Sequence, residues 1–176
     1  MFARFTEDAR RAVVRAGILA LDAGRPALDA DLMLLGVTEV RPFTLSSFTA
    51  SAHDVRERVD VGDARSLLAT LGIDLDQVHR RTRTGADTPA AWRLRRSRLR
   101  PLLVTLYGPL GEIPLAMHAR KVIEVAQCRP GPVTGERLLW GLLADCSNGA
   151  ARILCDSGVD LPELVREIGM PVRRAA

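Results

Sequence analysis

Apolar residues recur at helical spacing in two parts of the chain, and both stretches contain the same turn. Residues 64–78 and 150–164 align without a gap around a shared Gly-(Ile/Val)-Asp-Leu. In each stretch the pattern predicts an apolar helix that ends at a left-handed glycine, Gly72 or Gly158. The aspartate two residues later caps the next helix by accepting a hydrogen bond from a free backbone N–H. We therefore predict a helical hairpin that is used twice.

Two further pairs of segments match in the same order. Residues 5–13 parallel residues 115–123, and residues 31–37 parallel residues 136–142. Three ordered matches indicate a tandem repeat, because self-similarity at this scale is the signature of repeated helical units. The longest of the predicted helices runs from about Thr6 to Asp22.

These patterns predict an all-α fold of two pseudo-symmetric four-helix repeats packed together. Repeat one spans 1–81 with an insertion at about 38–58, an Arg-rich linker spans 82–113, and repeat two spans 114–172. Within the linker, the apolar residues 102–107 favour a short helix or strand that packs on the repeats. We expect the core to include Phe2, Phe5, Val13, Leu34, Leu35, Leu67, Leu68, Val122, Leu138, Leu139, Ile153 and Leu154.

The composition suits packed helices. Hydrophobic residues make up 47% of the 176 residues but aromatic residues only 4%, so the core consists mostly of aliphatic side chains. No apolar run reaches the length of a membrane span, and the first residues lack the apolar region of a signal peptide. Three cysteines without a C-x-x-C pair favour a reduced, cytoplasmic setting, and we expect Cys146 and Cys155 to be buried thiols.

The linker carries a cluster of arginines in a chain of net charge +4. Three interpretations remain open: a solvated or self-paired basic segment, a docking surface for an acidic protein, or a nucleic-acid contact. Only Trp92 offers an aromatic ring for base stacking in this segment. The cluster comprises the arginines at positions 80, 81, 83, 93, 95, 96, 98 and 100.

No catalytic or metal-binding pattern is present. His53, His79 and His118 are scattered, and together with the cysteines they do not form a zinc motif. No G-x-x-x-x-G-K-[ST] loop is present, so the chain lacks the donors that hold the phosphates of ATP. We therefore expect no cofactor, no metal, no catalytic residues and no enzymatic activity.

The opening Met1-Phe2-x-Arg4-Phe5-Thr6-x-x-Ala9-Arg10-Arg11, together with the twin hairpins, resembles a known family. The chain is similar to the N-terminal repeat domain of Clp unfoldases, especially those of the ClpC type, over nearly its whole length. Because the motor modules are missing from this sequence, the resemblance implies a recognition domain without ATP-driven machinery.

The resemblance implies a ligand groove between the first helices of the two repeats. In relatives from antibiotic-sensitive bacteria this groove binds cyclic peptide antibiotics. Leu115 stands where the family usually has phenylalanine. The alternative is that Phe2 and Leu115 only close the core between the two repeats. Carried over by position, the groove comprises Phe2, Arg10, Val13 and Val14 on one side and Leu115, Arg120, Lys121, Ile123 and Glu124 on the other.

The resemblance also implies binding of phosphorylated arginine, through a Gly-Thr-Glu-His motif at the start of the second helix of each repeat. Here the motif reads Asp29-Ala30-Asp31-Leu32 in the first copy and Thr134-Gly135-Glu136-Arg137 in the second. Asp31 and Glu136 retain the acid, whereas the threonine is lost from its place in both copies. The alternative is that both acids only favour a helix N-terminus.

The sequence thus predicts a non-enzymatic module that binds protein substrates or peptides. It would act as an adaptor, decoy or scavenger of protein substrates or of cyclic peptide antibiotics that target ClpC, and Clp unfoldase or protease components are possible partners. The alternative is a basic regulatory or nucleic-acid-associated protein that uses the Arg-rich linker. No membrane partner is expected.

Overall fold

The computed structural model describes residues 2–59, 88–97 and 102–169. The chain opens with a 3₁₀ turn (η1, Phe2–Arg4) and the helices α1 (Glu7–Asp22), α2 (Ala30–Val40) and α3 (Ala52–Arg58). A second 3₁₀ turn (η2, Pro89–Ala91) leads into the strands β1 (Arg93–Arg96), β2 (Val104–Gly108) and β3 (Gly111–Pro114). The helices α6 (Met117–Gln127), α7 (Gly135–Leu143), α8 (Ala150–Asp156) and α9 (Leu161–Ile168) follow.

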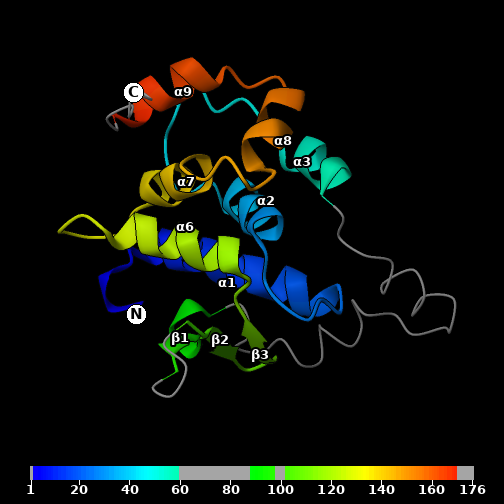
Figure 1. Ribbon diagram of the computed structural model, residues 1–176, viewed down its shortest axis with the longest axis vertical. Coiled ribbons are helices and arrows are strands. Elements are labelled where there is room, and N and C mark those ends of the chain that lie inside the picture. Colours follow the sequence, from blue (N-terminus) through cyan, green and yellow to red (C-terminus); the bar gives the residue numbers. More distant parts are fainter. Residues whose placement is uncertain (1, 60–87, 98–101, 170–176) are drawn as a thin grey trace, which may run out of the picture.

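The elements lie in tiers (Figure 1). The sheet lies at one end beside α1 and α6, the helices α2 and α7 lie in the middle, and α3, α8 and α9 lie at the other end. The helices α1 and α2 pack closely together, and so do α6 and α7. Among the described helices, none is long and apolar enough to cross a membrane.

The prediction of an all-α fold was wrong, because part of the linker forms a three-stranded antiparallel sheet of order β1-β2-β3. Each strand places apolar side chains on the inner side, and the register aligns Leu94 with Leu106 and Leu106 with Ile113. These three side chains are buried. Leu106 and Ile113 face Gly17 of α1, where a Cβ atom would come within 2.3 Å of Leu106 Cδ2. The absent side chain of Gly17 thus lets the sheet approach the helix.

Local signals in the sequence predicted several helix ends correctly. Thr6 caps α1 by accepting a hydrogen bond from the backbone N–H of Ala9. Gly158 has φ +80° and Asp160 accepts from the N–H of Glu163, as the hairpin pattern predicts. Residues 64–78, the first copy of that hairpin, lie outside the described residues.

The predicted core is confirmed wherever the structure describes it. Ten of the twelve residues are described, and all ten are at most 7% exposed. Leu67 and Leu68 lie outside the described residues. The expectation of buried thiols was wrong, because Cys146 and Cys155, like Cys128, are exposed.

Two short backbone bridges join the N-terminal and C-terminal parts of the chain in a crossed manner. The segment before α1 pairs with the segment before α7, since Phe5 forms a parallel bridge with Val133. The segment before α2 likewise pairs with the segment before α6, through Leu28 and Leu115. All four residues are buried. The first helix of each part is therefore anchored to the second helix of the other.

Candidate functional site

The predicted groove residues divide into a buried apolar set and a charged set nearer the surface. Val13 and Ile123 are fully buried, and Val14 is 2% exposed. Phe2 and Leu115 are also buried, at 6% exposure each. These apolar side chains therefore contribute to the core, and ligands from outside can reach mainly the charged members of the set.

On α6, the charged members of the groove are already engaged. Arg120 donates a hydrogen bond to the carbonyl of Leu102 at 2.7 Å, and Glu124 pairs with Arg96 of β1 at 2.8 Å. Both partners belong to the linker. Lys121 pairs with Asp145, 3.2 Å away. The linker thus occupies the α6 side of the predicted groove.

On the α1 side the groove remains open as a pocket of about 360 Å³. Phe2 and Arg10 contribute one wall. The other wall comes from η2 and β1, and not from α6 as predicted. Its residues are Ala90, Trp92, Arg93, Leu94 and Arg95. Sequence reasoning found the first wall but missed the second, although a tryptophan beside alternating Arg-Leu-Arg was a signal of a strand with one buried and one exposed face.

The guanidinium of Arg10 is fixed at this pocket. Its Nη2 donates to the carbonyl of Phe2 at 3.1 Å, and its Cζ lies 5.5 Å from the centre of the Phe2 ring. That ring in turn packs edge-on against Phe5, with centroids 5.2 Å apart. Arg10 Nε is buried and has no hydrogen-bond partner in the described part of the chain. The guanidinium is thus held in place with donor capacity unused.

A second pocket of about 370 Å³ lies between residues 3–6 and the pair Gly131 and Pro132. Here the guanidinium of Arg4 already forms four hydrogen bonds, to the carbonyls of Gln127, Arg129 and Gly131. Arg4 therefore holds the loop after α6, and most of its five N–H donors are already used.

The first phosphoarginine-like position, Asp31, lies beside the start of α8. Its carboxylate is half-buried, and a Cβ atom on Gly149 would come within 3.1 Å of its Oδ1. Burial raises the pKa of Asp31 and nearby Asp29 adds to this, while Arg152, Arg25 and His118 oppose the shift.

The second phosphoarginine-like position follows a glycine against which the insertion packs. Gly135 stands where the family motif has threonine, and a Cβ atom there would lie 2.2 Å from the carbonyl oxygen of Pro42. The backbone of the insertion thus occupies the space that a threonine side chain would need. Glu136, the next residue, is only partly exposed.

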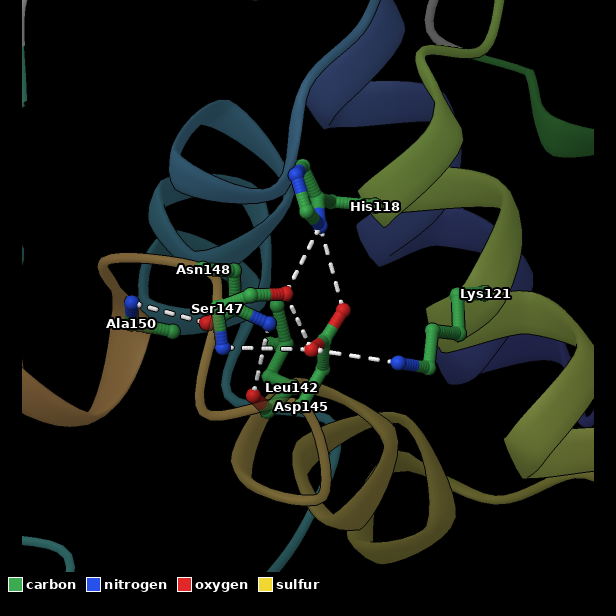
Figure 2. A network of polar contacts seen from close by, with 7 residues as sticks. All are labelled: His118, Lys121, Leu142, Asp145, Ser147, Asn148 and Ala150. Carbon is green, nitrogen blue, oxygen red and sulfur yellow. Dashed lines mark hydrogen bonds and ion pairs between the residues drawn. The ribbon is translucent and has the colours of Figure 1, made fainter.

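A buried carboxylate joins α6 to the loop between α7 and α8 (Figure 2). Asp145 is 4% exposed, and its Oδ2 lies 3.1 Å from His118 Nδ1. Ser147 donates its hydroxyl to Asp145 Oδ1 at 2.5 Å, and Lys121 pairs with the same oxygen. Hydrogen bonds from Ser147 and then His118 hold the pKa of Asp145 far below its usual range. Sequence reasoning missed this network, because its members lie far apart along the chain.

The network contains a serine, a histidine and an aspartate, but their geometry is not that of a hydrolase triad. In a triad the aspartate and the serine contact opposite ring nitrogens of the histidine. Here Ser147 Oγ and Asp145 both face His118 Nδ1, and the serine hydroxyl donates its hydrogen bond to the carboxylate. The arrangement therefore fixes the loop instead of activating the serine. In the described part of the chain no three His, Cys, Asp or Glu residues gather into a metal site.

No family model matches the chain, and no curated protein matches it. The relationship to the Clp N-terminal repeat domain therefore stays a prediction from the sequence motifs.

Proposed function

We propose that the chain is a non-enzymatic module that binds peptides or protein substrates, related to the N-terminal domains of Clp unfoldases. It would act as an adaptor, a decoy or a scavenger, including of cyclic peptide antibiotics that target ClpC. The observation that carries this proposal is the open pocket at Phe2 and Arg10, since two of the predicted groove residues line it.

The shape of the pocket supports a peptide ligand. Its volume of about 360 Å³ falls at the lower end of the usual range for ligand sites, which fits one or two side chains. Phe2, Trp92 and Leu94 form the buried base of the pocket, and Arg10 supplies a fixed polar group. Polar groups held in a fixed orientation give a ligand site its specificity.

The test is titration calorimetry of the full chain with a ClpC-directed cyclic peptide, phosphoarginine and an arginine-phosphorylated protein. The informative variant is Ala90→Trp, which fills the pocket from an exposed position of η2. Ala91→Trp is the matched control, because this neighbouring exposed alanine does not line the pocket.

We expect the wild type and Ala91→Trp to bind at least one of these ligands and Ala90→Trp to lose that binding. Equal binding by all three proteins would place the ligand elsewhere. If the wild type bound none of these ligands, the result would contradict the proposed function. A pull-down from the native cytosol, scored for Clp components, tests the adaptor role separately.

A further inference from the structure

The open pocket carries a concentration of positive charge that nothing in its walls neutralises. Three of its seven lining residues are arginines, Arg10, Arg93 and Arg95, and none is acidic. Within the described residues, the side chains of Arg93 and Arg95 form no ion pair. The next arginine along the strand differs, since Arg96 pairs with Glu124 at 2.8 Å. The pocket therefore gathers three arginines that form no ion pair within the described residues.

The strand geometry explains why two of the arginines reach the same place. Successive side chains of a strand point to opposite faces, so Arg93 and Arg95 share one face of β1 while Leu94 takes the other. Leu94 is 2% exposed, whereas both arginines are exposed. Burial of Leu94 against the core thus fixes the direction in which the two guanidinium groups project.

Arg10 adds a third guanidinium from the opposite wall. In the described part of the chain, the only hydrogen bond of its side chain is the one from Nη2 to Phe2. A guanidinium carries five N–H donors in a planar fork, and this fork matches the two oxygens of a carboxylate. An anion between the two walls would satisfy donors on both.

We propose that this pocket selects ligands that carry a carboxylate, and that its natural partner is an acidic segment of a protein or peptide. This inference rests on the proposed peptide-binding function and adds the class of ligand. The acidic side chain lies among the three arginines, above the buried side chains of Phe2, Trp92 and Leu94.

The burial of the aromatic residues in the pocket argues against nucleic acid as its ligand. Proteins that bind single-stranded nucleic acid stack the bases on exposed aromatic rings and follow the backbone along a basic groove. Trp92 is only 2% exposed and Phe2 only 6%, so neither presents a ring face to a base. The charge is also gathered in one compact pocket.

The experiment measures fluorescence anisotropy with two labelled peptides of about ten residues. One peptide alternates Glu and Leu, and the other has Gln in place of every Glu. A labelled oligothymidine of similar length is the third probe. The full chain is compared with the double variant Arg93→Gln/Arg95→Gln. The control is Arg11→Gln/Arg166→Gln, which removes the same charge from exposed arginines outside the pocket.

We expect the Glu peptide to bind at least roughly tenfold more tightly than the Gln peptide, because charge-assisted hydrogen bonds exceed the energy of a tenfold change. The pocket variant should lose most of this preference, and the control should keep it. Raising the salt from about 0.05 M to about 0.3 M should weaken binding of the Glu peptide selectively.

Three results would overturn the inference. Equal binding of both peptides, blocked in Ala90→Trp, would leave the peptide-binding function standing and remove only the acidic selectivity. Absence of binding by either peptide would refute the acidic ligand, and the calorimetric tests would then decide the broader function. Tighter binding of the oligothymidine, lost in the pocket variant, would assign the arginines to nucleic acid.

Discussion

Two glycines set how closely the paired helices approach. A Cβ atom on Gly36 of α2 would lie 2.7 Å from the carbonyl oxygen of Ala12 in α1. A Cβ atom on Gly141 of α7 would lie 2.5 Å from the carbonyl oxygen of Val122 in α6. Both contacts are with backbone atoms, which cannot move aside as the end of a side chain can. The same close contact therefore occurs in both helix pairs.

Gly36→Ala should destabilise the protein by about 1–3 kcal/mol, because the added methyl group forces α1 and α2 apart. Alanine is the better helix former by about 1 kcal/mol, so a net loss isolates the steric effect. Thermal unfolding followed by circular dichroism measures the change.

Gly149→Ala is the matched control for this substitution. Its Cβ atom would meet the end of the Asp31 side chain at 3.1 Å, and that carboxylate can rotate away. We expect a change within about 0.5 kcal/mol. A Gly36→Ala variant as stable as the control would show that the helices can separate without cost.

At the level of elements, the insertion is tied to the last described helix by one carboxylate. Glu167 of α9 accepts hydrogen bonds from the backbone N–H groups of Ser46 and Ser47, each 2.8 Å away. Both serine hydroxyls donate to the same carboxylate. These hydrogen bonds, with Ser47 contributing most, lower the pKa of Glu167 from an ordinary 4.5 to about 2.

This contact should weaken in acid. Because the folded-state pKa of Glu167 is depressed, the stabilisation is complete above the ordinary pKa of 4.5 and is lost as the pH falls through about 2. We expect the amide proton shifts of Ser46 and Ser47 to titrate with a midpoint near the lower value in an NMR acid titration.

Two substitutions in α9 test the assignment. Glu167→Gln should abolish the titration at both serines, since a neutral amide does not change charge. Glu163→Gln, an exposed acid of the same helix, should leave it intact. A wild-type midpoint near 4.5 would mean that the serines do not hold the carboxylate.

The elements that sequence could predict are those with local signals. The starts of α1 and α9 follow from Thr6 and Asp160, whose side chains cap the helix that follows them directly. The strands β1 and β3 have four residues each and exist only because β2 pairs with both. The arginines of β1 dominate the sequence pattern there, so the sequence indicates a charge cluster and gives little sign of a sheet.

The same distinction applies to the site. Phe2 and Arg10 were found through a sequence motif near the start of the chain. Their partners across the pocket, Arg93 and Arg95, could not be assigned, because their position depends on how β1 packs near α1. Of the Arg cluster, only Arg93, Arg95 and Arg96 lie within the described residues, and the pairing of Arg96 with Glu124 likewise could not be foreseen from the sequence.

At the level of the whole molecule, the sheet is part of the core. Leu106 is fully buried, and its Cδ2 lies near Gly17 of α1. Leu106→Ala should therefore cost roughly 2–5 kcal/mol by opening a cavity between the sheet and the helices. Urea unfolding followed by both circular dichroism and tryptophan fluorescence measures the loss.

Tyr107→Ala serves as the control, because this neighbour lies on the other face of β2 and is 40% exposed. We expect it to cost less than about 1 kcal/mol. An equally small cost for Leu106→Ala would mean that the sheet rests on the helices without stabilising them.

The crossed bridges have a consequence for how the chain can be divided. Phe5 needs Val133 and Leu28 needs Leu115, so each part of the protein completes the backbone pairing of the other. A fragment that ends in the linker would present two unpaired edges together with the apolar surface beneath them. The pairing also requires segments that are far apart in the sequence to meet before their backbone hydrogen bonds can form, which slows folding. Engineering or evolution must therefore keep the two helical parts together as one unit, because neither part completes its own backbone pairing.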